Sequence, residues 1–340
     1  MLEFEPGKML PLAVTMGEPA GIGGEITLKT WRCRGDGVPP FYLIDDPQRI
    51  TALARRLGWS VQVQVIDTPG DALRVFSEAL PIVPIGVPLR GSAAQPDPTD
   101  APAILSSIET AVGHVRSGQA AALVTNPIHK GNLYRAGFRH PGHTEYLAAL
   151  AGVAEPPVMM LVCPALRVVP VTIHLALHQA IRELSTIAIV HAGRVTEAAL
   201  RRDFGVVAPV LAIAGLNPHA GEAGGLGREE IEIIEPAITE LRAAGIEARG
   251  PLAADTMFHP EARQSYDAAL CMYHDQALIP IKTIDFHGGV NVTLGLPYVR
   301  TSPDHGTGFA IAGRGVARAE SLIAALRLAA DMAARRVAAG

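Results

Sequence analysis

The chain has 340 residues, of which 49% are hydrophobic and 18% are charged, and its formal net charge at pH 7 is −4. This balance argues against a disordered chain and supplies the apolar residues for one large folded domain or two ordinary ones. The negative charge gives no overall attraction to nucleic acid or to anionic membranes, so neither partner is expected. No run of about 18 uncharged apolar residues occurs. The acidic start M-L-E-F-E-P-G-K lacks the pattern of a secretory signal, so we expect a soluble cytoplasmic protein.

Short apolar segments alternate with longer segments of helical periodicity along the chain. We expect strands at residues 10–16, 41–44, 61–66, 82–85, 121–125, 158–163, 168–173, 210–215, 268–272 and 290–294. Helical spacing is clearest in residues 22–32, 47–57, 101–117, 184–203, 227–244 and 319–337. This alternation predicts an α/β fold with a largely parallel sheet, in which ligands bind at the carboxyl ends of strands.

The first predicted strand is followed by a glycine-rich segment, M-G-E-P-A-G-I-G-G-E. A dinucleotide-binding fingerprint, G-x-G-x-x-G, needs a third glycine that is missing after Gly21 and Gly23. We interpret the segment as a tight turn before a helix, with Glu25 favourably placed in the first turn of that helix. A nicotinamide cofactor would therefore have to be bound by another structural device. The isolated cysteines, Cys33, Cys163 and Cys271, are interpreted as buried thiols.

Three of the 12 histidines, His174, His219 and His274, follow predicted strands. Neutral imidazoles from three strand ends could bind one divalent metal and leave coordination positions open, as in a catalytic site. Their wide separation carries no local ligand signature such as H-E-x-x-H, so each could equally be a structural histidine. Asp255 and Asp275 could orient ligating imidazoles, or they could cap helices.

Further polar residues could bind a small substrate that carries several oxygen atoms. The segment P-G-H-T-E, which contains His143 and Thr144, precedes a helical stretch. Thr144 is expected to cap that helix, whose free amides could bind a carboxylate or a phosphate. Lys282 lies among apolar residues, Asn291 interrupts an apolar strand and Arg300 ends another apolar segment. Each residue alone could be structural, but together they favour a site for an anionic, hydroxylated ligand.

Several segments, taken in order, resemble the 4-hydroxythreonine-4-phosphate dehydrogenase family of the vitamin B6 (pyridoxine) pathway. They are T-M-G-E-P-A-G-I-G, P-G-H-T-E, G-L-N-P-H-A-G-E, Y-H-D-Q, G-V-N-V-T-L-G-L-P and R-T-S-P-D-H-G-T, and the resemblance extends from about Leu12 to about Leu328. It implies an oxidoreductase that oxidises 4-phosphooxy-L-threonine with NAD or NADP. The product, 2-amino-3-oxo-4-phosphooxybutanoate, would decarboxylate to 3-amino-2-oxopropyl phosphate during pyridoxal 5'-phosphate biosynthesis.

The resemblance also implies a two-domain fold like that of isocitrate and isopropylmalate dehydrogenases, with a central cleft. Residues 1–127 with 296–340 would form the domain on the cofactor side. Residues 128–295 would carry most metal and substrate residues and the interface of a homodimer whose active sites are shared between subunits. One divalent metal per active site (zinc, magnesium, cobalt or manganese) would be bound by His174, His219 and His274.

Residue roles follow from the same resemblance. The implied substrate contacts are His143, Thr144, Lys282, Asn291 and Arg300. The proton of the alcohol would leave to Lys282 or to a hydroxide on the metal. By analogy with the isocitrate-type dehydrogenases, the cofactor would lie near His305, Gly306 and Thr307.

The sequence departs from the family pattern beside the expected substrate. After Y-H-D-Q it reads A-L-I-P-I-K, where family members have a glycine after the glutamine, and T-I-D-F-H-G-G follows. These changes leave open a paralogous dehydrogenase of a phosphorylated sugar acid, such as phospho-threonate or phospho-erythronate. A non-redox, metal-dependent lyase or hydrolase that uses the same three histidines is a further alternative.

Overall fold

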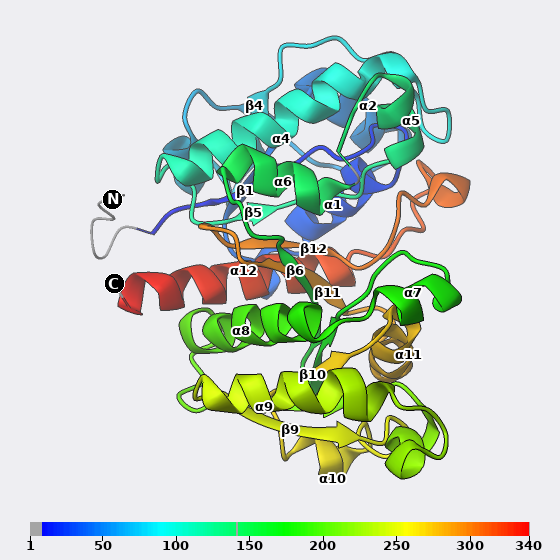
Figure 1. The fold of residues 1–340 in the computed structure, drawn as a ribbon. Coiled ribbons are helices and arrows are strands. Elements are labelled where there is room, and N and C mark those ends of the chain that lie inside the picture. Colours follow the sequence, from blue (N-terminus) through cyan, green and yellow to red (C-terminus); the bar gives the residue numbers. More distant parts are fainter. Residues whose placement is uncertain (1–8, 141, 340) are drawn as a thin grey trace. The chain divides into compact units, whose positions relative to one another are not determined.

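The computed structural model describes residues 9–140 and 142–339, which divide into two compact units (Figure 1). Unit 1 contains the chain up to Pro157 and Leu296–Ala338, and unit 2 is Val158–Gly295. The expectation for the first eight residues lies outside the described part of the chain. Within that part, no helix combines the length and the apolar character needed to cross a membrane.

The sheet of unit 1 is parallel. Its strands are β1 (Leu12–Thr15), β2 (Phe41–Asp45), β3 (Val63–Val65), β4 (Leu80–Pro84), β5 (Leu123–Val124) and β12 (Arg300–Pro303). They lie in the order β3-β4-β2-β1-β5-β12, and each strand runs parallel to its neighbours. Every residue of β1 is buried, which is typical of a central strand in a parallel sheet covered on both faces.

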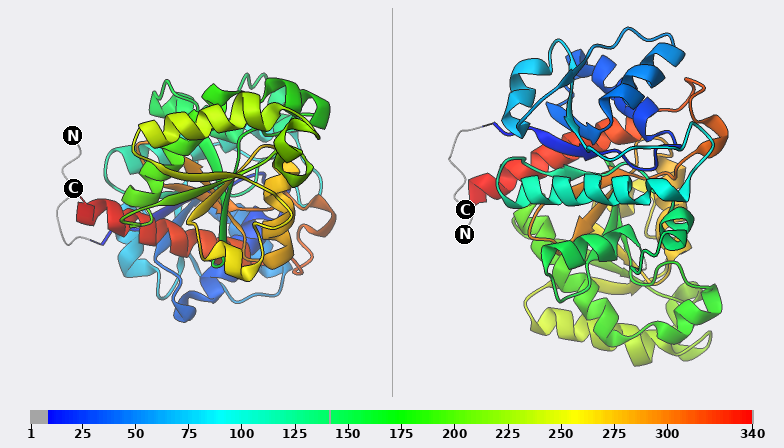
Figure 2. Two further views of the ribbon diagram at one scale, coloured as in Figure 1. Left: turned by 60° about the horizontal axis from the view of Figure 1, so that its bottom comes forward. Right: turned by 90° about the horizontal axis from the view of Figure 1, so that it is seen from above.

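Helices cover both faces of this sheet. They are α1 (Gly23–Arg32), α2 (Pro47–Arg56), α3 (Ala72–Val75), α4 (Ala101–Arg116), α5 (Lys130–Arg135), α6 (His143–Ala151) and α12 (Glu320–Ala339). On one face, Ile104 and Ile108 of α4 join a buried cluster with Tyr42 and Leu123. On the other face lies α12 (Figure 2, right), whose Ala325 carbonyl accepts a 2.9 Å hydrogen bond from the Thr301 hydroxyl.

Residues 128–157 belong to unit 1, whereas the sequence analysis assigned them to the second domain. The physical reason is apolar packing, because Leu133 of α5 and Leu147 of α6 lie in the same buried cluster as Tyr42. The units divide again between Gly295 and Leu296.

The sheet of unit 2 is mixed. Its strands are β6 (Val158–Cys163), β7 (Leu166–Pro170), β8 (Val210–Ala214), β9 (Glu247–Leu252), β10 (Ala268–Cys271) and β11 (Val290–Leu294). They lie in the order β11-β6-β7-β10-β8-β9. β6 is antiparallel to both of its neighbours, whereas β7, β10, β8 and β9 run parallel to one another. The carboxyl ends of β7, β10 and β8 therefore meet at one edge of the sheet.

The helices of unit 2 also cover both faces of its sheet. They are α7 (Leu177–Glu183), α8 (Thr186–Arg202), α9 (Glu235–Ala243), α10 (Pro260–Arg263) and α11 (His274–Ile284). Ala277 and Ile281 of α11 pack with Leu161 and Ala269 on one face. α8 and α9 lie side by side over the other face (Figure 2, left).

The predicted α/β fold with largely parallel strands is confirmed. Two strands were not predicted from the sequence: β9, whose sequence E-A-R-G-P-L contains glycine and proline, and β12, whose sequence R-T-S-P is short and polar. Helix α11 was not predicted at all, because Pro280 stands inside it. Cys163 and Cys271 are buried as predicted, but Cys33 is partly exposed, so that expectation was wrong.

Candidate active site

The glycine-rich turn of unit 1 serves close packing. A Cβ added at Gly21 would lie 2.8 Å from the carbonyl oxygen of Thr307, so only glycine permits this approach. The same carbonyl accepts a 2.9 Å hydrogen bond from the Ile22 amide. Helix α1 begins at Gly23 with Glu25 in its first turn, as predicted. The loop that carries His305, Gly306 and Thr307 is therefore attached to this turn.

The three candidate metal ligands follow neighbouring strands of unit 2. His174 follows β7, His274 follows β10 and His219 follows β8, and β10 pairs in parallel with both of the other strands. All three histidines thus belong to segments at the carboxyl edge of the parallel part of the sheet. This edge is where ligands bind in α/β folds.

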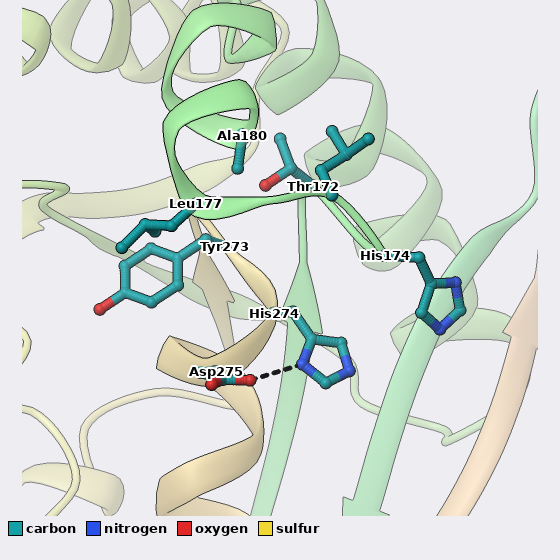
Figure 3. A pocket seen from close by; sticks show the side chains of 8 residues that line it. Thr172, His174, Leu177, Ala180, Tyr273, His274 and Asp275 are labelled. Atoms are coloured by element: carbon teal, nitrogen blue, oxygen red, sulfur yellow. Dashed lines mark hydrogen bonds and ion pairs between the residues drawn. The ribbon is translucent and has the colours of Figure 1, made fainter.

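Two of these histidines, His174 and His274, have neighbouring rings and line the same pocket (Figure 3). Their ring centroids lie 5.9 Å apart. The pocket has a volume of about 240 Å³ and is lined by Thr172, His174, Leu175, Leu177, Ala180, Tyr273, His274 and Asp275. The Thr172 hydroxyl donates a 2.7 Å hydrogen bond to the Met272 carbonyl, which ties together the two strand ends that precede these histidines.

The ring of His274 is oriented by the residue that follows it. Nδ1 of His274 lies 2.7 Å from Oδ1 of Asp275. The carboxylate can only accept, so Nδ1 carries the proton and Nε2 is left as a lone-pair donor for a metal. Asp255, the other candidate for this role, is exposed and makes no hydrogen bond to a histidine among the residues that the structure describes.

His219 lies in a left-handed turn. Residues His219, Ala220, Glu222 and Ala223 all have positive φ, between 44° and 53°, and Gly221 has φ 78°. His174 has φ 54°. For residues with a Cβ this conformation costs about 1–2 kcal/mol each, and such strain is concentrated at functional sites. Two of the three candidate ligands thus stand on strained backbone.

The donor types suit a divalent metal, but the described part of the chain does not bring three of them together. No group of three His, Cys, Asp or Glu side chains with metal-binding geometry occurs in residues 9–140 and 142–339. The pocket contains His174 and His274, whereas His219 is exposed and is not among its lining residues. Two neighbouring imidazoles, one with its tautomer fixed by a carboxylate, are nevertheless the ligands that zinc and similar metals prefer.

In unit 1, the buried Arg300 and the partly buried His143 form an electropositive environment. Arg300 is 4% exposed, and its Nε and Nη2 donate to the Thr125 hydroxyl at 3.2 and 2.6 Å. Burial lowers the pKa of Arg300 to about 10. Burial, with Arg300 and Lys130 nearby, lowers the pKa of His143 well below its usual value. These surroundings disfavour positive charge, so an anionic ligand would be stabilised there.

Helix α6 begins at His143, and Gly142 is its N-cap. The prediction that Thr144 caps the helix is therefore wrong, because the helix begins at His143, two residues before the start that a Thr144 cap implies. The amides of His143, Thr144 and Glu145 are in the first turn, where they have no intrahelical acceptor. The buried Nε2 of His143 has no hydrogen-bond partner within the described part of the chain.

The remaining candidates, Lys282 and Asn291, lie in unit 2. Lys282 follows His274 by two turns of α11, which places it about 12 Å further along the helix axis. Its Nζ lies 5.4 Å from the centre of the Phe286 ring, and it is not among the residues that line the pocket. Asn291 is partly buried in β11, where it pairs with Leu161 of β6.

Two polar residues around these sites, Thr125 and Glu230, were not predicted from the sequence. Thr125 follows β5 in the same way that His174 follows β7, so the same strand-end signal could have found it. Glu230, which contacts the turn of His219, has no such signal, because its role depends on how the chain folds back.

These observations describe an α/β enzyme with a candidate metal centre and a separate group of residues that favours anions. The sequence profile of the family described as "Pyridoxal phosphate biosynthetic protein PdxA" matches residues 38–329, and the chain belongs to this family.

The relatives agree with this assignment. The 4-hydroxythreonine-4-phosphate dehydrogenase of Caulobacter vibrioides is 55% identical over 331 residues, covering 96% of this chain and 98% of the relative. That of Methylorubrum populi is 56% identical, covering 96% and 95%. The crystal structure of the enzyme of the same name from Klebsiella pneumoniae superposes with a TM-score of 0.85 at 35% identity and covers 96% of this chain and 100% of that one.

Proposed function

We propose that this protein is a metal-dependent dehydrogenase that oxidises 4-phosphooxy-L-threonine with NAD or NADP. The product, 2-amino-3-oxo-4-phosphooxybutanoate, then decarboxylates to 3-amino-2-oxopropyl phosphate. The observation that carries the proposal is the pair His174 and His274, with neighbouring rings at the carboxyl edge of the sheet and with Asp275 on His274. The near full-length relatives that bear this enzyme's name support the choice of substrate.

His174, His219 and His274 would hold one divalent cation, which we expect to be zinc, magnesium, cobalt or manganese. When bound, such a cation supplies Lewis acidity to an alcohol or ketone oxygen. The chain's own part is to fix the ligating nitrogens. Asp275 sets the tautomer of His274, and the Thr172 hydroxyl joins the strand ends that carry His174 and His274.

Other residues would bind the anionic groups of the substrate. Arg300 offers a desolvated guanidinium, and the first turn of α6 at His143 and Thr144 offers free amides. His143 is neutral near pH 7, so its Nε2 can exchange a hydrogen bond with a substrate oxygen. Lys282 and Asn291 would complete the contacts, with Lys282 as a candidate acceptor of the alcohol proton. Holding both ends of the substrate fixes the reacting carbon for hydride removal.

The nicotinamide cofactor, which accepts the hydride, would bind beside His305, Gly306 and Thr307. This loop is held by the Gly21 turn through the Ile22 amide. Attachment to the first turn of the parallel sheet places the loop at the carboxyl end of β1, the usual position of a ligand in such a fold. We expect the enzyme to work in the cytoplasm.

We further propose a homodimer whose active sites are shared between subunits. Exposed apolar side chains lie on the elements that border the pocket. The exposed fraction is 57% for Leu177 of α7, 64% for Ile279 of α11 and 68% for Phe286, which follows α11. Exposed apolar groups of this size favour burial by a partner. A second subunit could also supply His219, which does not line the pocket of its own chain, and Lys282, which lies two turns beyond His274 on α11.

The test is the appearance of reduced nicotinamide when the purified protein receives 4-phosphooxy-L-threonine and NAD⁺. Turnover should stop after treatment with a chelator and return with added Zn²⁺, Co²⁺, Mg²⁺ or Mn²⁺. Full activity of the metal-free protein would disprove the proposed dependence on a divalent metal. Turnover of a substrate without any nicotinamide would replace it with the lyase or hydrolase alternative.

A paralogous substrate is the second candidate. A terephthalate 1,2-cis-dihydrodiol dehydrogenase from Burkholderia xenovorans LB400 shares this fold with a TM-score of 0.63 at 28% identity, so the fold is not restricted to one alcohol. Phospho-threonate and phospho-erythronate should therefore be assayed beside 4-phosphooxy-L-threonine. A higher kcat/KM for either sugar acid would reassign the substrate and keep the dehydrogenase chemistry.

A further inference from the structure

Glu230 is a buried carboxylate that binds the two residues immediately before the turn of His219. It is 2% exposed and stands at the start of a π-helical turn, η5 (Glu230–Ile234), which leads into α9. Its Oε1 accepts hydrogen bonds from the amides of Leu216 at 2.8 Å and Asn217 at 2.7 Å. Its Oε2 accepts a bond of 2.9 Å from Nδ2 of Asn217.

The carboxylate lies inside the left-handed turn η4 (Pro218–Gly224). A Cβ added at Gly221 would lie 2.5 Å from Oε2 of Glu230, so the turn closes directly onto the carboxylate. A Cβ added at Gly215 would lie 2.9 Å from Cα of Ala220, so the strand end and the turn are also in close contact. Glu230 therefore joins the end of β8 to the strained residues that follow it.

The end of β8 is joined to the helix of His274 as well. Gln276 of α11 donates from Nε2 to the Gly215 carbonyl at 2.7 Å, and its Oε1 accepts from the Met272 amide at 2.6 Å. The side chain of Gln276 is buried. Glu230 and Gln276 thus both bind the segment that follows β8, Glu230 at Leu216 and Asn217 and Gln276 at Gly215. This segment therefore connects the backbone before His219 to the helix that begins with His274.

We propose that Glu230 is a positioning residue, which holds Leu216 and Asn217 and thereby the left-handed turn η4 that presents His219 to the metal. The inference rests on the proposed function for the identity of that metal, and it concerns a residue that touches neither metal nor substrate. Two properties separate this role from simple core packing. Both oxygens of Glu230 are engaged by the loop, and the loop's strained conformation would relax without an acceptor at this position.

The experiment compares Glu230→Asp, Glu230→Gln and Glu230→Ala with the control Glu229→Gln. Glu229 accepts a 2.7 Å bond from the same Asn217 amide group but none from the amides of Leu216 and Asn217. Asp keeps the charge but withdraws the oxygens by one methylene group. Gln has the same side-chain length as Glu, and its amide oxygen can still accept both backbone N–H bonds. The Gln variant should therefore keep most of the protection of the loop that the Ala variant loses.

Two readouts are needed. Hydrogen exchange in the metal-free protein should rise about tenfold or more over residues 216–226 in the Asp and Ala variants, and little in the Gln variant or the control. The dissociation constant for Zn²⁺ should rise about 10- to 100-fold in the Asp variant. In a His219→Ala background, Glu230→Asp should cause no further loss of Zn²⁺ affinity, because it acts through His219.

Unchanged hydrogen exchange over residues 216–226 in the Asp variant would overturn the inference. If the Ala variant does not fold, the Asp variant alone still provides this test. An equal loss of Zn²⁺ affinity with and without His219 would also overturn it, since Glu230 would then act elsewhere. A wild-type protein that binds no Zn²⁺ or Co²⁺ would defeat the proposed function. The exchange measurement on the metal-free protein would still decide whether Glu230 holds the turn.

Discussion

Asp275 accepts a 2.7 Å hydrogen bond from Nδ1 of His274, the residue immediately before it in α11. The orientation of this ring is therefore set within the first turn of one helix. Its other nitrogen is left for the pocket, where the ring of His174 lies 5.9 Å away (Figure 3).

Replacing Asp275 by Asn should weaken metal binding without removing a ligand. The amide is a poorer acceptor than a carboxylate, so the His274 ring loses both its fixed tautomer and part of its basicity. We expect the dissociation constant for Zn²⁺ to rise about 10- to 100-fold, measured by competition with a chromophoric chelator. Asp255→Asn is the matched control and should leave the constant unchanged. An equal effect of both variants would mean that net charge, and not this hydrogen bond, controls the affinity.

His219→Ala should lower the metal content of the purified protein together with its rate. The loss of one of three proposed imidazole ligands removes a coordinate bond that water replaces poorly. Metal content by elemental analysis, per mole of protein, is the measurement. His178→Ala removes an exposed histidine of α7 and is the control. An unchanged metal stoichiometry in the His219 variant would exclude this residue as a ligand.

Arg300→Lys should raise KM for the phosphorylated substrate and spare the affinity for NAD⁺. Lysine keeps the charge but cannot offer paired N–H groups to a phosphate or carboxylate. The lost charge-assisted bond corresponds to about a 10- to 100-fold change in KM. Arg116→Lys is the control, because Arg116 is exposed and donates a 2.7 Å hydrogen bond to the Leu150 carbonyl, away from the proposed substrate contacts. The same loss with a dephosphorylated analogue would show that Arg300 does not bind the phosphate.

The stability of the protein should fall in mild acid, and His143 should contribute to the fall. Burial lowers the pKa of His143 below its usual value of 6.5, so the unfolded chain binds a proton that the folded chain does not. Stability from this group is complete above about pH 6.5 and decreases by up to about 1.4 kcal/mol per pH unit as the pH falls towards the folded-state pKa.

Urea unfolding between about pH 7.5 and about pH 5.5 measures this slope. His143→Gln should make it shallower, whereas His287→Gln, at an exposed position, should not. An identical slope in the His143 variant and the wild type would show that His143 is protonated equally in both states.

The local sequence was sufficient for most of the fold. Strand β6 begins and ends where its apolar run does, because a strand buried on both faces needs consecutive apolar residues. Strand β11 also has the predicted bounds, although its sequence V-N-V-T-L alternates apolar and polar residues. Strands β9 and β12 were not predictable in this way. Most of their residues are polar, glycine or proline, and the strands form because neighbouring strands supply hydrogen-bond partners that no local pattern records.

The same distinction holds for the candidate site. The sequence by itself determined which residues could ligate a metal or bind an anion, because chemical type and position after an apolar strand are local properties. Only the tertiary structure decided that β10 lies between β7 and β8, which places the segments of His174, His274 and His219 at one sheet edge. It also decided that the buried carboxylate of Glu230 reaches back to the turn of His219. Strand order and such long-range hydrogen bonds depend on how distant segments pack, and a single chain's local pattern does not contain that information.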